Sequence, residues 1–275
     1  MLLAERLGVE PEGIDGWEVA TKLSSTGFTL GDRELKSYAR RIAAAAVLRR
    51  AWQLVGPIRR ATRPVVDVMD EPFRGELEVE ATLENMAGKR FPDREDWIVE
   101  RREDREQQVV VMMDASLSMA GENLAIAAVA AAVLTLKLRS EDVSVVAFES
   151  KAHALSHLEE RDDPEEVVER LLAEPARGYT NIEDALRVGG RELRRGRNPR
   201  KAGLLITDGV YTAGGDPTPF ADAFPRLFVL LTEDYKMDPT LCARLARVGR
   251  GEVFHVKHHA ELPAKMLDIA NRVLR

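Results

Sequence analysis

The chain has 275 residues, a length that suits one large or two small domains. Its hydrophobic content of 45% is sufficient for a core, and its 31% of charged residues favours a soluble surface over a membrane-embedded one. The formal net charge of −6 gives no general electrostatic reason to bind nucleic acid or an anionic membrane, which argues against both classes.

The first strong pattern is a long amphipathic helix over Asp32–Val55. Large apolar residues recur there at three- and four-residue spacing, namely Leu35, Tyr38, Ile42, Ala45, Leu48, Trp52 and Val55. Gly56-Pro57 ends the helix. We expect residues 1–106 to form a mainly helical region that packs on the rest of the chain, because the apolar face of this helix needs a partner.

Arginines make the same region locally basic: Arg40, Arg41, Arg49, Arg50, Arg59, Arg60 and Arg63. The pattern favours a solvated helix face. The alternative interpretation is a patch for RNA or phosphate, which would make the protein a nucleic-acid-associated adaptor.

Residues 64–106 have no clean period. Alternating apolar positions from Leu77 to Leu83 suit a strand, whereas the spacing of Leu77, Leu83 and Met86 after Gly75 suits a helix, and both interpretations stay open. A short strand is predicted at Trp97-Ile98-Val99, followed by a charged connector over Glu100–Gln107.

From residue 107 to 275 strands and helices alternate, which predicts an α/β domain with a doubly wound, mostly parallel sheet of about six strands. The expected strands are Gln108–Met113, Val143–Phe148, His153–Leu155, Gly203–Thr207, Leu227–Thr232 and Glu252–Val256. The expected helices are Asn123–Leu138, Pro164–Leu172, Ile182–Arg194, Pro239–Val248 and Leu262–Leu274. The first of these helices is almost uniformly apolar, so it should lie buried against the sheet.

Oxygen-bearing side chains follow two of the predicted strands and precede one helix. Asp114, Ser116 and Ser118 alternate after the first strand, Thr180 precedes Ile182–Arg194, and Asp208 ends another strand. Carboxylates and hydroxyls suit a hard cation such as Mg²⁺ or Mn²⁺. Because the carboxyl ends of parallel strands share one edge of a sheet, we expect a single metal site there.

These five residues, in this order and strand context, resemble the metal-ion-dependent adhesion site of von Willebrand factor A domains. The resemblance covers roughly Gln107 to the C-terminus. The family usually has glycine between the two serines, where this chain has Leu117. The resemblance implies that the hydroxyls bind the metal directly, whereas the aspartates act mostly through water or as hydrogen-bond acceptors behind the ligands. It also implies that a carboxylate from a partner protein completes the coordination.

The upstream segments Arg74-Gly75-Glu76-Leu77 and Ala81-Thr82-Leu83-Glu84, with the helix before them and the charged lead after them, resemble bacterial CoxE-like, MoxR-associated proteins. The resemblance implies a MoxR-type AAA+ ATPase as a partner, in assembly or metal loading of a client complex.

Competing interpretations of the site residues are structural or enzymatic. In the structural interpretation no metal is bound, Asp114 and Asp208 cap adjacent helices, and the serines cap a turn. A hydrolase or phosphatase would use Asp114 as nucleophile, but Ser116 stands where such enzymes need a second acid. We therefore expect an interaction module without turnover.

The remaining features are weaker. His255, His258 and His259 gather at a strand end, and a polar loop is favoured there over a zinc site. Residues 212–216 are glycine-rich and are interpreted as a flexible loop beside the metal. The single cysteine, Cys242, favours a buried small hydrophobe and a reducing compartment. With no signal-peptide pattern at Met1–Arg6 and no apolar stretch long enough to span a bilayer, the expected location is the cytoplasm.

Overall fold

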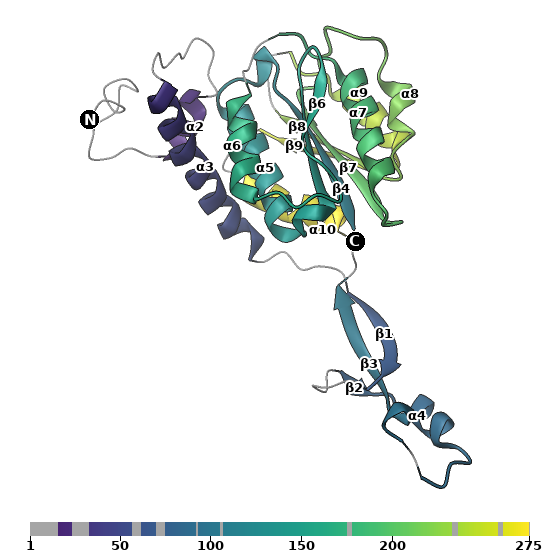
Figure 1. Ribbon diagram of the computed structural model, residues 1–275. Helices are drawn as coiled ribbons and strands as arrows, with labels where there is room; N and C mark the ends of the chain where they lie inside the picture. The colour runs from purple at the N-terminus through teal and green to yellow at the C-terminus, as the bar shows by residue number, and fades with distance from the viewer. Residues whose placement is uncertain are drawn as a thin grey trace. The chain divides into compact units, whose positions relative to one another are not determined.

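The computed structural model describes residues 16–23, 33–56, 62–69, 75–91, 93–104, 107–174, 178–232, 236–257 and 261–274. It divides into two units, drawn in Figure 1. The first unit combines two N-terminal helices, α2 (Gly16–Leu23) and α3 (Arg33–Val55), with residues 107–273. The second unit is made of residues 59–106 and the last two residues of the chain.

The first unit is built around a six-stranded sheet with the strand order β6-β5-β4-β7-β8-β9. Strand β6 runs antiparallel to β5, and the other neighbouring pairs are parallel. The strands are β4 (Gln108–Asp114), β5 (Val143–Phe148), β6 (Ala152–Ser156), β7 (Lys201–Thr207), β8 (Leu227–Thr232) and β9 (Val253–Val256). Strands β4, β5 and β8 are buried along their whole length, as expected for strands covered on both faces. The predicted doubly wound, mostly parallel sheet is confirmed.

Helices cover both faces of this sheet (Figure 1). They are α5 (Glu122–Lys137), α6 (Pro164–Ala173), α7 (Ile182–Arg195), α8 (Thr218–Ala221), α9 (Pro239–Val248) and α10 (Leu262–Val273). Helices α7, α8 and α9 lie on one face, whereas α5, α6 and α10 lie on the other. Side chains at the predicted starts cap three of them: Asp163 accepts from the backbone N–H of Glu165, Asn181 from Asp184 and Asp238 from Leu241.

Helix α5 is buried from residue 124 to residue 135 without a polar face. The sheet covers one side of it, and α3 packs on the other side, next to α6. The predicted burial of this helix is confirmed, and its second partner is the N-terminal helix.

Helix α3 packs with a different face from the one that the sequence predicts. Its buried residues are mostly small: Ala39, Ala43, Ala44, Val47, Ala51 and Val55. Of the predicted apolar face, Val55 is buried, whereas Tyr38 and Trp52 are exposed. The prediction of that face was wrong because alanines let two helix backbones approach closely, and this packing outweighs burial of a few large side chains.

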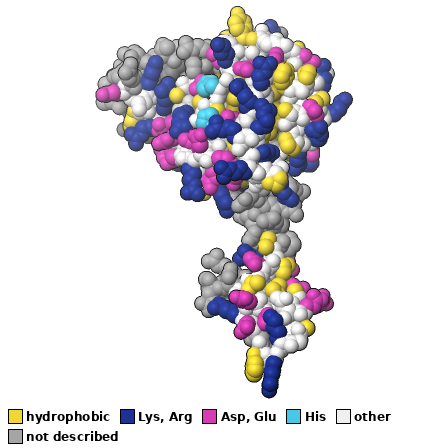
Figure 2. Space-filling view, turned by 45° about the vertical axis from the view of Figure 1, so that its right-hand side comes forward, with side chains coloured by type: hydrophobic (Ala, Val, Ile, Leu, Met, Phe, Trp, Pro, Cys, Tyr) yellow, Lys and Arg dark blue, Asp and Glu magenta, His cyan; other side chains and the backbone are white. Residues whose placement is uncertain are grey.

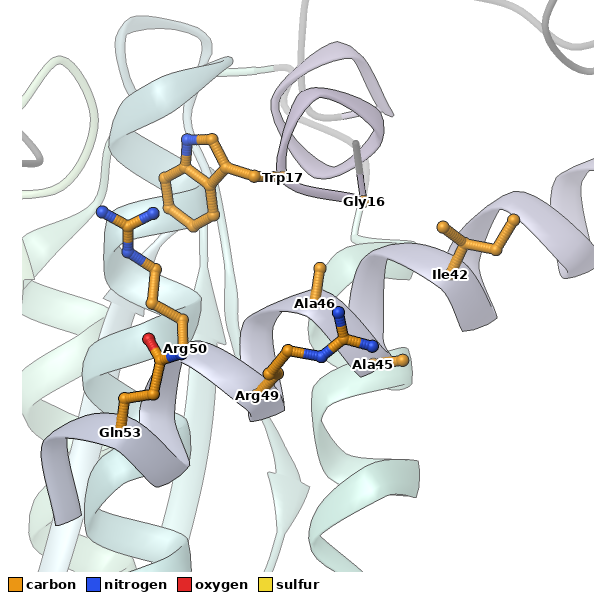
Figure 3. A pocket seen from close by; sticks show the side chains of 8 residues that line it. All are labelled: Gly16, Trp17, Ile42, Ala45, Ala46, Arg49, Arg50 and Gln53. Carbon is orange, nitrogen blue, oxygen red and sulfur yellow. The ribbon is translucent and has the colours of Figure 1, made fainter. Parts of the chain in front are cut away.

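Helix α2 packs against α3 and also contacts α5. The Trp17 ring lies 4.8 Å from the Arg50 guanidinium, a cation–π contact (Figure 3). The backbone of Gly16 lies close to Ala46, where a larger residue would collide. Figure 3 shows the hollow that these side chains line between the two helices.

The second unit is a small antiparallel sheet with the strand order β1-β3-β2 and one α-helix. Its elements are β1 (Thr62–Val68), β2 (Glu76–Leu77), α4 (Val79–Met86), the 3-10 turn η2 (Arg94–Asp96) and β3 (Ile98–Asp104). Three strands therefore stand where the sequence predicts a mainly helical region. Of the two open interpretations for residues 75–87, a short strand and then a helix both occur. The connector predicted at Glu100–Gln107 was wrong, since residues up to 104 belong to β3.

Hydrogen bonds tie α4 to β3. Glu78 caps α4 by accepting from the Ala81 N–H at 3.2 Å. The Thr82 hydroxyl accepts from the Ile98 N–H at 3.0 Å. The Lys89 ammonium pairs with the Asp96 carboxylate, and this hydrogen bond holds the pKa of Asp96 below its usual value.

Candidate metal centre

The candidate site lies between β4 and β7, where the chain connections to the next strands run in opposite directions along the sheet. Strands β4 and β7 are neighbours, and the chain continues from β4 to β5 on one side and from β7 to β8 on the other. The connections leave the carboxyl ends of β4 and β7 in opposite directions, which opens a crevice between them. Asp114 ends β4, and Asp208 follows β7 directly.

Asp114 is fully buried and both of its carboxylate oxygens are hydrogen-bonded. The backbone N–H of Ser116 donates to Oδ1 at 2.9 Å, and the Thr207 hydroxyl donates to Oδ2 at 2.7 Å. Burial raises the pKa of Asp114 to about 7, an effect that these hydrogen bonds oppose and the nearby Asp208 carboxylate increases. Asp114 thus holds the loop after β4 against the end of β7.

The two serines lie side by side on that loop. Their hydroxyl oxygens are 3.1 Å apart, with Ser116 buried and Ser118 exposed. Between them Leu117 begins the 3-10 turn η3 (Leu117–Met119), and 55% of the Leu117 surface is exposed. Leu117 has no left-handed backbone conformation, so the turn accommodates a side chain where the resembling family usually has glycine.

The loops that carry Thr180 and Asp208 are fixed by short-range contacts. The Thr180 N–H donates to the Thr212 hydroxyl at 3.0 Å, and the Thr212 N–H donates back to the Thr180 carbonyl at 2.9 Å. Asp208 is fully buried, and its Oδ1 accepts from the Val210 N–H at 2.9 Å. The two loops therefore hold each other beside the end of β7.

One hollow of about 380 Å³ joins these loops. Its lining includes four of the five predicted residues, namely Ser116, Ser118, Thr180 and Asp208. The fifth, Asp114, is connected to this lining because its carboxylate accepts a hydrogen bond from the Ser116 N–H. The structure thus brings the predicted residues together. The lining also contains residues whose role in the site the sequence does not indicate: Leu117, Gly178, Tyr179, Val210, Thr212 and Lys236.

The capping interpretation of the aspartates does not fit these contacts. Helix α7 is capped by Asn181 and α9 by Asp238, while Gly121 stands at the start of α5. Asp114 and Asp208 instead accept hydrogen bonds within their own loops. Ser116 precedes η3 without a side-chain cap.

The donor set fits a hard divalent cation. Within the described residues no three His, Cys, Asp or Glu side chains are placed to hold a metal, so a cation here would need the hydroxyls of Ser116, Ser118 and Thr180. Two buried carboxylates, Asp114 and Asp208, lie close enough to disfavour each other's charge. A cation in the hollow would offset that repulsion.

Other clusters have less chemistry to offer. The hollow between α2 and α3, about 390 Å³, is of similar size but is lined by apolar residues, two arginines and Gln53, with no carboxylate or hydroxyl. Of the predicted histidine cluster, His255 lies in β9, while His258 and His259 lie outside the described residues. Donor chemistry, and not volume, therefore singles out the site at β4 and β7.

Comparison with known proteins identifies the family that this part of the chain resembles. Residues 109–210, which include all five predicted site residues, match the family model of the von Willebrand factor type A domain. The six-stranded unit has the von Willebrand factor type A fold. Domains of this family are typically metal-dependent protein interaction modules and are generally not enzymes. No curated protein matches the chain.

Solved structures show the same fold at low identity. A von Willebrand factor type A protein from Catenulispora acidiphila aligns with a TM-score of 0.50 and 17% identity over 64% of this chain and 45% of its own. Proximal thread matrix protein 1 from the mussel byssus aligns with a TM-score of 0.52 and 18% identity over 62% of this chain and 48% of its own. A further structure of that mussel protein has zinc in its metal-ion-dependent adhesion site, with a TM-score of 0.51, 18% identity and the same coverage. The chain spans less than half of the length of these proteins.

Proposed function

We propose that Asp114, Ser116, Ser118, Thr180 and Asp208 form one divalent-cation site, for Mg²⁺ or Mn²⁺, and that the chain uses it to bind a partner protein. The observation that carries the proposal is the convergence of three hydroxyls and Asp208 on one hollow above the buried Asp114. The zinc-occupied site in the mussel protein of the same fold supports a divalent metal at this place.

In this proposal the residues divide into two groups. The hydroxyls of Ser116, Ser118 and Thr180 face the hollow as direct ligands, whereas Asp208 orients water at its buried edge. Asp114 positions the serine loop through the Ser116 N–H, and Thr207 fixes the orientation of its carboxylate. Neutral hydroxyl ligands leave a bound cation with residual positive charge and an open coordination position.

A carboxylate from a partner protein fits that position. An Asp or Glu side chain would replace a water and gain a charge-assisted contact in a partly desolvated hollow. Lys236 lines the same hollow and adds a positive charge that also favours an acidic partner. The proposed function is therefore metal-dependent protein binding without turnover.

The finer part of the proposal concerns the partner. The resemblance of the upstream segments to CoxE-like, MoxR-associated proteins supports a MoxR-type AAA+ ATPase as the neighbour of this chain, in assembly or metal loading of a client complex. The buried Cys242 supports a reducing compartment, the cytoplasm. Within the described part of the chain no helix is long and apolar enough to cross a membrane.

The two alternative functions have less support. A phosphatase would need Asp114 as an accessible nucleophile, but this carboxylate is fully buried and both oxygens are hydrogen-bonded. A nucleic-acid adaptor would need a basic face on α3, where Arg50 already stacks on Trp17. Figure 2 shows acidic and basic side chains interspersed on the visible face, which disfavours a polyanion.

A pull-down from native extract tests this proposal. The full chain should retain partner proteins in Mg²⁺ and lose them in EDTA, and Thr180→Ala should weaken retention in Mg²⁺ because it removes one ligand. Recovery of a MoxR-type ATPase would support the finer proposal. Partners that bind equally in EDTA would contradict the metal-dependent mode, as would hydrolysis of a phosphate or peptide substrate that is lost on Asp114→Ala.

A further inference from the structure

In the part of the chain that forms the six-stranded sheet and its helices, residues 107–273, the large exposed apolar side chains gather around the candidate metal centre. Among the described residues from 107 to 273, three such side chains are exposed: Leu117 at 55%, Tyr179 at 65% and Tyr211 at 38%. They belong to three different loops of the site. Leu117 and Tyr179 line the hollow, and Tyr211 stands between Val210 and Thr212, which also line it. We call these three residues the apolar rim.

Surface apolar residues scattered singly need no explanation, but a group around one concave site marks an interaction surface. Tyrosine is also among the residues that contribute most to protein–protein binding energy. The rim residues lie at or beside the hollow on which the hydroxyls and Asp208 converge. A partner segment that enters the hollow would lie next to these side chains.

The rim is held in place before any partner binds. The Tyr179 N–H donates to the Ser150 hydroxyl at 3.2 Å, and the hydrogen bonds between Thr180 and Thr212 tie the loop of Tyr179 to the loop of Tyr211. Leu117 is anchored by its turn, because Met119 at the other end is fully buried and accepts from the Thr232 hydroxyl at 3.1 Å. A fixed rim loses little conformational freedom on binding.

Charge and apolar surface together define the ligand chemistry. The proposed cation and Lys236 favour one negative charge at the centre of the hollow, whereas the rim favours apolar groups around it. A free anion or a run of acidic residues would satisfy the centre and leave the rim exposed to water.

We propose that the site selects a protein segment in which a single Asp or Glu is flanked by large apolar side chains. The inference rests on the proposed function, since the acidic residue is the one that meets the metal. The apolar flanks would cover Leu117, Tyr179 and Tyr211, exclude water around the carboxylate and so strengthen its contact with the cation.

Short synthetic peptides test this selectivity with the full-length chain at saturating Mg²⁺. One peptide carries Leu-Glu-Leu within a Gly-Ser background, the second Gly-Glu-Gly and the third Leu-Gln-Leu, and affinities are measured by NMR titration up to millimolar peptide. We expect Leu-Glu-Leu to bind at least about tenfold more tightly than Gly-Glu-Gly, because two apolar side chains become buried. Leu-Gln-Leu should bind weakly.

Variants assign the preference to the rim. Leu117→Ser and Tyr211→Ser should each lower the affinity ratio of Leu-Glu-Leu to Gly-Glu-Gly towards one. Trp52→Ser on α3 removes a large apolar side chain that is 61% exposed, and it should keep the wild-type ratio. Because both peptides are compared on the same protein, a change in metal affinity cancels from the ratio.

The outcomes separate this inference from the proposed function. Equal affinity for Leu-Glu-Leu and Gly-Glu-Gly, with Leu-Gln-Leu weaker than both, would overturn the apolar selectivity and leave metal-dependent acid binding intact. If the affinity ratio of Leu-Glu-Leu to Gly-Glu-Gly is unchanged in both Leu117→Ser and Tyr211→Ser, the apolar selectivity is also overturned. If neither Glu peptide binds better than Leu-Gln-Leu, the proposed function is wrong, and the inference with it.

Discussion

Thr207 decides how the Asp114 carboxylate is presented. Its hydroxyl donates to Asp114 Oδ2 at 2.7 Å and accepts from the Gly209 N–H at 3.1 Å, so one side chain orients both the carboxylate and the start of the loop that follows Asp208. No feature of the sequence alone distinguishes this threonine from other residues of a buried strand. In the proposed site Thr207 acts through Asp114, which positions the serine loop, and groups behind metal ligands typically change metal affinity strongly when they are removed.

We therefore predict that Thr207→Val lowers the affinity for Mg²⁺ or Mn²⁺ by about 10- to 100-fold while the fold persists. Calorimetric titration measures the effect. Thr135→Val is the matched control, because the Thr135 hydroxyl is also buried but bonds to the Ala131 carbonyl within α5. If the two variants bind the metal equally well, the positioning assigned to Thr207 is wrong.

Cys242 is the other buried residue with a testable chemistry. Burial, and then the charges of Asp238 and Asp208, raise the pKa of its thiol from 9.0 to about 12. The folded protein keeps this proton more strongly than the unfolded chain does. The contribution to stability is therefore neutral well below pH 9.0 and turns unfavourable as pH rises from 9.0 to about 12.

Two measurements check this prediction. At pH 8 the native thiol should react far more slowly with a disulfide reagent than the thiol of the protein unfolded in guanidinium, because the thiolate is the reactive form. Above pH 9 the free energy of unfolding should fall more steeply for the wild type than for Cys242→Ala. Rapid labelling of the native protein at pH 8 would contradict the burial of this side chain.

At the scale of elements, the sequence predicted those parts of the fold that repeat a simple pattern. Strand β8 and helix α9 have the predicted bounds, and the caps at Asp163 and Asp238 lie where Asp-Pro occurs in the sequence. The five predicted site residues, which the structure brings together, were selected because each lies near a strand end or a helix start. These signals are local, so they need no knowledge of tertiary packing.

Features that depend on packing were missed. On α3 the large apolar residues suggested the wrong face, since a pattern of hydrophobicity gives little weight to alanines that allow close helix packing. Strand β3 was interpreted in part as a connector, because its charged residues are tolerated in a sheet of three strands. Lys236 reaches the hollow from a loop whose course the sequence does not reveal, whereas Tyr179 was passed over although it adjoins Thr180.

The observed face of α3 leads to a prediction for two neighbouring alanines. Ala43 is fully buried, whereas Ala45 is exposed on the same helix. Ala43→Leu should destabilise the protein by about 1–3 kcal/mol, because added methylenes overpack a close helix contact. Ala45→Leu has the same helix propensity change and should cost less than about 0.5 kcal/mol.

Denaturant unfolding of both variants gives the comparison. Equal midpoints for Ala43→Leu and Ala45→Leu would contradict the alanine face. A larger loss for Ala45→Leu would restore the face that the sequence first suggested.

For the whole molecule, the main question is which segments the sheet domain needs to be stable. The sequence predicts a boundary between residues 106 and 107, with the von Willebrand factor type A domain at 107–275. In the structure the N-terminal helices α2 and α3 share one unit with residues 107–273. The reason is α5, which is apolar on all sides and therefore needs cover beyond the sheet.

We predict that a fragment of residues 107–275 is less stable than the full chain by at least about 3 kcal/mol, since loss of α3 exposes the outer side of α5 and part of α6 to water. It should also bind a hydrophobic dye that the full chain does not bind. A fragment of residues 33–275, which keeps α3, is the control and should recover most of the difference. If 107–275 unfolds at the same denaturant concentration as the full chain, α3 is dispensable and the predicted boundary is that of an independent domain. If 33–275 is as unstable as 107–275, α3 does not provide the stabilisation.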